Sequence, residues 1–277
     1  MGDILKAVLG GIIQGLTEFL PVSSSGHLAI FDNIFNFGFG DDALLFTLVL
    51  HLGTLAAVFI AYFRDIKELF IGFFTLIPKV FTGKFKYGAL EKRERFVILI
   101  LIATVPLVVG ALIDKQIEWL SDRTKLIGGF LILNAVILFL SDKIKTKNIT
   151  EKNAAPKQAL LVGLWQLIGV PPGLSRSGMT ITGGLLNGFS RTFAVKFSFI
   201  MSIPAILGAS AFKFADVIKN GADIAGTMIA SCALGFIFAF VFGLFAIIFI
   251  RIIVKNRSFY VFSIYCFTAG LIAVIFG

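Results

Sequence analysis

The stretch EFLPVSSSGH, residues 18–27, places a carboxylate, three consecutive serines and an imidazole between two apolar segments. Pro21 ends a helix, because proline lacks the N–H that the next backbone hydrogen bond needs. Gly26 permits the tight backbone that precedes the following helix. A bilayer tolerates such irregular backbone only where it lines a cavity or is buried in protein. The stretch therefore predicts that residues 3–36 form a helix, a break and a returning helix.

The composition of the chain indicates a membrane protein. Of its 277 residues, 57% are hydrophobic and only 15% are charged, whereas soluble domains are about 45–50% apolar. The formal net charge is +9, but the basic residues lie in loops between apolar spans, so we expect contact with a lipid bilayer and not with nucleic acid. No cleavable signal peptide is expected, because Gln14 and Glu18 interrupt the first apolar stretch.

Six further segments approach the roughly 20 apolar residues that cross a bilayer. Another apolar region, residues 158–190, is interrupted near its middle by PPGLSRSG, residues 171–178, much as residues 3–36 are interrupted. The sequence therefore predicts an all-α polytopic membrane protein with two re-entrant helix–break–helix hairpins and six transmembrane helices. The predicted spans are residues 44–63, 96–113, 125–140, 194–214, 225–250 and 258–276.

The two interrupted regions match each other at an offset of 152 residues. The offset aligns glycine with glycine, glutamine with glutamine and serine with serine, and it aligns Ser24 with Arg176. Each half of the chain then holds one hairpin and three spans. Because three is an odd number, the second half enters the membrane with the opposite orientation. We expect an inverted repeat of residues 1–150 and 151–277, in one integral membrane domain, with a site near the midplane where the breaks meet. The matching pairs are Gly11 with Gly163, Gln14 with Gln166, Ser23 with Ser175, Ser25 with Ser177, and Gly26 with Gly178.

The distribution of Lys and Arg predicts the orientation. Loops 64–95, 142–157, 190–196 and 251–257 contain 18 basic residues, and the opposite side contains 6. Because cytoplasmic loops are enriched in Lys and Arg, both termini are expected outside the cell and the first hairpin is expected to open outward. In this interpretation residues 64–95 form a solvated cytoplasmic loop.

The first break contains polar side chains that can bind an anion. Gln14 and Glu18 are four residues apart and share a helix face. Ser24 or Ser25 is expected at the N-cap of the returning helix, where free N–H groups attract anions.

The second break repeats this arrangement and adds a cation. Ser175 and Ser177 are expected at the start of its returning helix, and Arg176 carries a planar fork that suits two phosphate oxygens. The candidate anion-binding residues of the two breaks are Gln14, Ser23, Ser25, Gly26, Ser175, Ser177 and Gly178.

These groups together indicate phosphoryl transfer. A serine hydroxyl or the histidine imidazole supplies a nucleophile, a carboxylate accepts a proton or holds a metal, and Arg176 and backbone N–H groups stabilise charge on the phosphoryl group. The chain lacks a Walker loop, so a nucleotide is not indicated. With Glu18 as the one firm carboxylate, magnesium or calcium would take most of its coordination from phosphate oxygens and water.

Several alternatives remain open at this point. Glu18 and Arg176 are also compatible with an ion pair that only holds the hairpins together, and His27 with a packing residue. His51 is interpreted as structural, because its segment LVLHLGTL has no local polar cluster. The rival function is a secondary transporter or lipid flippase that binds an anionic substrate at the same midplane site.

QGLTEFLPVSSSGH, residues 14–27, and PGLSRSG, residues 172–178, resemble the motifs of the bacterial undecaprenyl-diphosphate phosphatases, also called bacitracin-resistance proteins. The resemblance implies an inner-membrane enzyme that removes the terminal phosphate of undecaprenyl diphosphate, recycling the lipid carrier of cell-wall synthesis. It further implies a divalent cation, a possible homodimer, and catalytic roles for Glu18, Ser24, His27 and Arg176. Gln14 stands at a position where the family has Glu or Gln, which argues against a scheme with two first-motif carboxylates on a metal.

Overall fold

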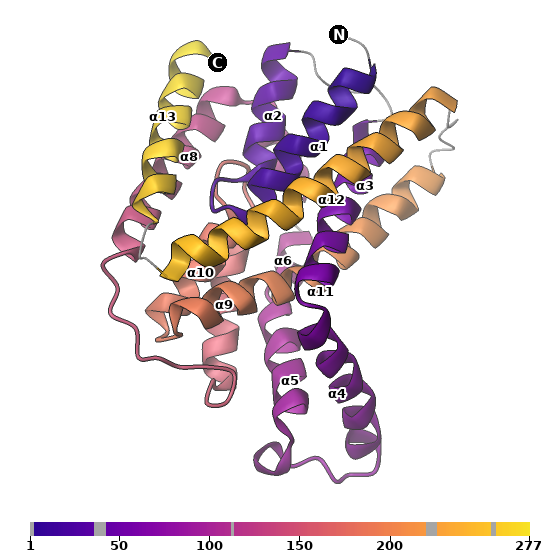
Figure 1. Ribbon diagram of the computed structural model, residues 1–277, viewed down its shortest axis with the longest axis vertical. Helices are drawn as coiled ribbons and strands as arrows, with labels where there is room; N and C mark the ends of the chain where they lie inside the picture. The colour runs from indigo at the N-terminus through magenta and orange to yellow at the C-terminus, as the bar shows by residue number, and fades with distance from the viewer. Residues whose placement is uncertain (1–2, 36–42, 112–113, 220–225, 256–258) are drawn as a thin grey trace.

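The computed structural model describes residues 3–35, 43–111, 114–219, 226–255 and 259–277, and almost all of its secondary structure is α-helical (Figure 1). Within these ranges an isolated bridge between Ile149 and Phe189 is the only β-type pairing. The prediction of an all-α chain rich in apolar helices is confirmed. The helices that follow the two hairpins are α3 (Ala43–Ala61), α4 (Phe63–Phe81), α5 (Lys92–Thr104), α6 (Leu107–Ala111), α7 (Asp114–Ser121), α8 (Thr124–Ser141), α11 (Arg191–Lys219), α12 (Gly226–Lys255) and α13 (Tyr260–Phe276).

Both expected helix–break–helix units are present. The first is α1 (Asp3–Phe19) followed by α2 (Ser24–Phe35), and the second is α9 (Pro156–Ile168) followed by α10 (Arg176–Leu186). Figure 1 shows α1 and α2 in the upper half of the bundle and α9 and α10 below them. The two breaks, near residues 20–23 and 169–175, are therefore the parts of these units that can meet.

The predicted number of spans is not confirmed. Among the described residues, three helical segments are long and apolar enough to cross a bilayer: Thr124–Ser141, Arg191–Ala211 and Met228–Val254. A fourth span is possible if α3 and α4 act as one broken element, although they are bent by 91°. The segment expected at 258–276 is α13, an apolar helix of 17 residues.

Two segments differ from their predicted structure. Residues 96–113 are not one helix, because α5 ends at Thr104 and α6 starts after Pro106, where the ring removes a backbone donor. Residues 64–95 are not a simple loop, because most of α4 lies there. Large apolar side chains at helical spacing are exposed along α4, and α4 projects from the bundle beside α5 (Figure 1).

An ion-pair cluster fixes the base of α4 to the second half of the chain. Lys196 on α11 contacts Asp65 and Glu151, the latter at 2.7 Å, and Lys92 on α5 also pairs with Glu151. Burial raises the pKa of Glu151, but the hydrogen bonds from Lys196 and Lys92 outweigh it and leave this pKa below its usual value. The cluster therefore keeps Glu151 charged and joins α4, α5 and α11.

Small residues allow α1 to lie directly against α12. A Cβ atom added at Gly11 would stand 2.6 Å from the Gly235 carbonyl oxygen, and one at Gly15 would stand 2.7 Å from the Ala239 carbonyl oxygen. Close backbone approach of this kind is typical of helix pairs in membranes. The contact holds in place the helix face of α1 that carries Gln14 and Glu18.

Candidate active site

The two breaks are built from equivalent residues. Ser23 precedes α2 and its Oγ accepts a hydrogen bond from Gly26 N at 3.3 Å, while Ser175 precedes α10 and accepts from Gly178 N at 3.1 Å. These serines are partners at the 152-residue offset. The N-cap expected at Ser24 or Ser25 is therefore Ser23, and α2 begins at Ser24. The φ of Ser23 is 74°, in the left-handed region.

The breaks touch each other through hydrogen bonds between their tips. Gly173 N donates to Ser23 Oγ at 3.0 Å, and Ser177 Oγ donates to the Leu20 carbonyl oxygen at 3.1 Å. Gly26 leaves room for this contact, because an added Cβ would stand 2.8 Å from Gly173 N. The predicted approach of the two breaks is present in the structure.

Asn134, a buried residue of α8, joins both breaks with one amide group. Its Nδ2 donates to the Pro21 carbonyl oxygen at 2.9 Å, and its Oδ1 accepts from Ser175 N at 3.3 Å. No local feature of the sequence indicates this role, because Asn134 stands alone in an apolar helix. An amide is suited to this position since it offers a donor and an acceptor together.

We expect Asn134→Leu to lower the thermal unfolding midpoint, because it removes the acceptor of Ser175 N and leaves the Pro21 carbonyl oxygen with only the weak donor Cys266 Sγ at 3.8 Å. A buried backbone group that loses its partner costs about 1–3 kcal/mol. The measurement is thermal unfolding of purified protein in detergent. Ser141→Ala is the matched control, since Ser141 is buried on the same helix and its hydroxyl donates to Leu138 O within that helix. Equal midpoints for the two variants would contradict the bridging role.

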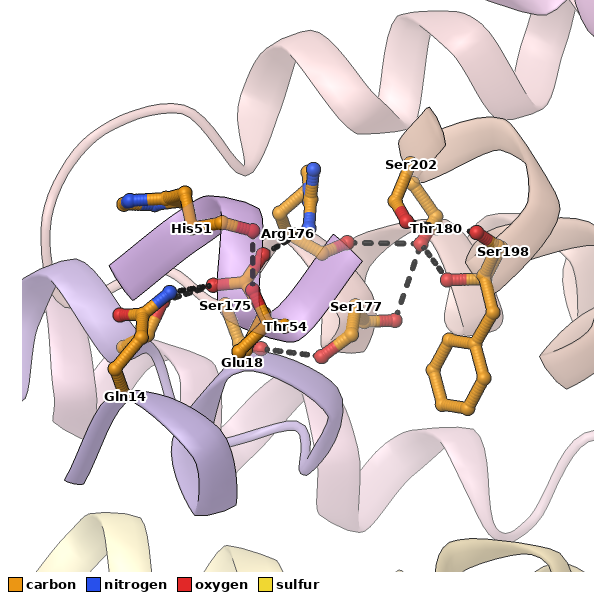
Figure 2. Close-up of polar contacts among 12 residues, drawn as sticks. Gln14, Glu18, His51, Thr54, Ser175, Arg176, Ser177, Thr180, Ser198 and Ser202 are labelled. Atoms are coloured by element: carbon orange, nitrogen blue, oxygen red, sulfur yellow. Dashed lines mark hydrogen bonds and ion pairs between the residues drawn. The ribbon is translucent and has the colours of Figure 1, made fainter. Parts of the chain in front are cut away.

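Glu18 is the centre of the polar cluster (Figure 2). Its Oε1 forms an ion pair with Arg176, which comes from the other break. Its Oε2 accepts hydrogen bonds from Gln14 Nε2 at 3.0 Å and from Ser24 Oγ at 2.6 Å. Glu18 is buried, while 23% of the Arg176 side chain remains exposed. The structure thus brings four predicted residues together and leaves the guanidinium partly accessible.

A buried pair of hydroxyl groups supports the first turn of α10. Thr180 Oγ1 donates to the Arg176 carbonyl oxygen and lies 2.6 Å from Ser198 Oγ on α11 (Figure 2). The pair links the turn that carries Arg176 to a second helix. Sequence reasoning missed both residues, because isolated Ser and Thr in apolar helices have no distinctive pattern.

The imidazole of His27 bonds to groups other than Glu18. Its Nδ1 lies 2.7 Å from the Ser23 carbonyl oxygen and its Nε2 lies 2.8 Å from the Tyr265 hydroxyl on α13. Both ring nitrogens therefore have partners outside the Glu18 cluster. Tyr265 is a further residue that the sequence analysis did not identify.

His51 is nearer to the cluster than its sequence suggested. It lies on α3 close enough to Glu18 for an electrostatic interaction, and its Nδ1 lies 2.8 Å from the Thr47 carbonyl oxygen. The interpretation of His51 as structural stays a prediction, and the structure adds that α1 brings Glu18 near it across the helix contact. No local signal in the sequence identifies such a neighbour.

The candidate anion-binding residues of the two breaks have different surroundings in the structure. Ser25 is exposed, so its side chain does not join the buried cluster. Ser175 and Ser177 lie 3.0 Å apart between their hydroxyl oxygens, and Gly178 packs against Pro21 and Asn134. These residues build the contact between the breaks, whereas Gln14 is the candidate anion-binding residue that bonds to Glu18, beside Ser24 and Arg176.

The donor set of the cluster fits a hard cation with few protein ligands. Among the described residues there is no group of three His, Cys, Asp or Glu side chains that could hold a metal ion. The amide Oε1 of Gln14 is buried without a hydrogen-bond partner beside the Glu18 carboxylate. Amide and carboxylate oxygens suit magnesium or calcium, so Gln14 and Glu18 could provide a small share of its ligands.

Comparison with known proteins gives consistent matches along the chain. The model of the family described as bacitracin resistance protein BacA matches residues 7–272. An undecaprenyl-diphosphatase of Alkaliphilus metalliredigens is 39% identical over 275 residues, covering 98% of this chain and 98% of the relative. A protein with the same name from Methanosphaera stadtmanae is 38% identical, and the match covers 99% of this chain and 98% of that relative. One from Parabacteroides distasonis is 39% identical, and the match covers 97% of this chain and 96% of that relative.

Proposed function

The chain belongs to the bacitracin resistance protein BacA family, and from this premise we propose that it hydrolyses undecaprenyl diphosphate to undecaprenyl phosphate and orthophosphate. It is a membrane phosphatase. The observation that carries this function is the cluster at the contact of the two breaks, where a serine hydroxyl, a carboxylate and a partly exposed guanidinium converge. Neither the cluster nor the comparisons favour the transporter alternative.

A lipid diphosphate suits the surroundings of this cluster. The reacting groups are held by helices whose outward faces carry many exposed apolar side chains. An isoprenoid tail can remain among such side chains while its diphosphate reaches Arg176. The exposed part of that guanidinium offers its planar fork to phosphate oxygens.

In the first step, Ser24 Oγ attacks the terminal phosphorus. The new Ser24 O–P bond forms as the bond from phosphorus to the bridging oxygen breaks, and that electron pair leaves with undecaprenyl phosphate. Glu18, which already accepts the hydrogen bond of this hydroxyl at 2.6 Å, takes the serine proton. Arg176 stabilises the charge on the transferring phosphoryl group.

In the second step, water attacks the phosphoserine. Its oxygen bonds to phosphorus, and both of its protons remain on oxygens of the orthophosphate that leaves. The bond to Ser24 Oγ breaks, and Glu18 returns the proton to that oxygen. The alternative nucleophile is His27, which would form a phosphohistidine. The occupied ring nitrogens of His27 favour Ser24, because attack by His27 would first require the loss of a hydrogen bond.

A divalent cation is part of the proposal. Gln14 Oε1 and the Glu18 carboxylate would hold it, together with phosphate oxygens and water. When bound, it would neutralise charge on the diphosphate.

We also propose the finer architecture and placement. The protein is an inverted repeat of residues 1–150 and 151–277, with six spans and two re-entrant hairpins, and forms a homodimer in the bacterial inner membrane. Both termini and the opening of the site lie outside the cytoplasm. The ratio of 18 to 6 basic residues supports this orientation, and the equivalent caps at Ser23 and Ser175 support the repeat.

The function is tested with purified protein, a polyprenyl diphosphate and magnesium or calcium, with orthophosphate as the measured product. We expect sustained release, and loss of release when a chelator removes the cation. In sealed vesicles, movement of the intact lipid without phosphate release would instead identify a transporter.

A further inference from the structure

His27 and Tyr265 form a closely matched pair between α2 and α13. Their rings are stacked, with centroids 5.5 Å apart and an interplanar angle of 10°. The Tyr265 hydroxyl lies 2.8 Å from His27 Nε2, and His27 itself is buried. The phenol thus contacts His27 by both its ring and its oxygen.

The hydrogen bonds of this pair determine where its protons lie. A carbonyl oxygen only accepts, so the His27 Nδ1 that faces Ser23 O at 2.7 Å carries a proton. In the neutral ring, Nε2 is then the acceptor, and the Tyr265 hydroxyl donates to it. The result is a series of two hydrogen bonds: the Tyr265 hydroxyl donates to His27 Nε2, and His27 Nδ1 donates to the Ser23 carbonyl oxygen.

These hydrogen bonds end on Ser23, a residue with a strained backbone. Ser23 has a φ of 74°, a left-handed conformation that costs free energy in a residue with a side chain. Its carbonyl oxygen also accepts from His27 N at 3.2 Å, and its Oγ accepts from Gly173 N of the other break. The conformation of Ser23 sets the direction of the next residue, Ser24, toward Glu18.

We propose that Tyr265 is a positioning residue of the phosphatase, which acts through His27 to hold Ser23 in the conformation that aims Ser24 at Glu18. The activity part of this inference rests on the proposed function. The structural part, a hydrogen bond that fixes the His27 ring, does not.

The test uses Tyr265→Phe, which keeps the stacked ring and removes the hydroxyl. Tyr260→Phe is the matched control, because Tyr260 lies on the same helix and is 50% exposed, against 47% for Tyr265. The chain has only two histidines, so ¹⁵N-histidine labelling gives two ring systems, and His51→Ala assigns them.

We expect Tyr265→Phe to displace the Nε2 resonance of His27, and Tyr260→Phe to leave it in place. In the phosphate-release assay we expect kcat to fall about 2- to 10-fold, because the variant loses one hydrogen bond. We expect little change in KM. An unchanged His27 resonance, or a rise in KM at constant kcat, would overturn the inference. If the wild-type protein releases no phosphate, the proposed function fails, and the resonances still test the pair.

Discussion

Arg176→Ala is expected to lower kcat/KM by about 10²- to 10³-fold or more, because a single preorganised donor to a transition state contributes about that much. Arg176 is the one cation at the contact of the two breaks in the described structure, and its guanidinium is partly accessible to a phosphate. Phosphate release by protein that elutes as a single folded species is the measurement. Arg176→Lys keeps the charge but loses the planar fork, so we expect only partial recovery.

Arg191→Ala is the matched control for this prediction. Arg191 also forms an ion pair, with Asp142 at 3.1 Å, but it lies at the start of α11, away from the Glu18 cluster. We expect this variant to unfold at a lower temperature and to keep most of its activity. Near-normal turnover by folded Arg176→Ala protein would restrict the Glu18–Arg176 pair to the structural role of joining the hairpins.

Ser24→Ala is expected to abolish turnover by orders of magnitude and to prevent formation of a phosphorylated enzyme. The reason is that Ser24 provides the attacking oxygen in the proposed mechanism, and its hydroxyl donates a 2.6 Å hydrogen bond to Glu18, the proposed proton acceptor. The measurement is a rapid quench after mixing with substrate labelled in its terminal phosphate, followed by mass spectrometry of the peptide that contains residue 24. Glu18→Gln should slow the appearance of the label, because the amide cannot accept the proton.

Parallel acid and alkaline quenches separate the two candidate nucleophiles, since phosphoserine survives acid and phosphohistidine survives alkali. Ser190→Ala is the control, because Ser190 caps α11 through Phe193 N and takes no part in the cluster. Label retained in Ser24→Ala protein and located on His27 would replace the serine mechanism with the histidine one.

The centre of the site was predictable because its signals are local. Proline, glycine and serine mark each break within a few residues, and the offset between the breaks pairs Ser23 with Ser175. From these signals the sequence predicts that Arg176 reaches Glu18, and the structure contains this pair.

The residues that surround this centre were not predictable from local signals. Asn134, Tyr265 and His51 are single polar residues in apolar helices, and each acquires its partners only through helix packing. The error at residues 64–95 has another cause, because basic residues at both ends of α4 obscured its helical spacing. The error at 96–113 came from Pro106, which divides an otherwise continuous apolar run.

The Asn134 amide and the Ser23 hydroxyl connect chain segments more than 100 residues apart. It follows that neither fragment obtained by cutting the chain between α8 and α9 would carry a complete set of reacting groups. Glu18 and Ser24 would remain on one fragment and Arg176 on the other, so catalysis would return only by complementation, when the two fragments reassociate.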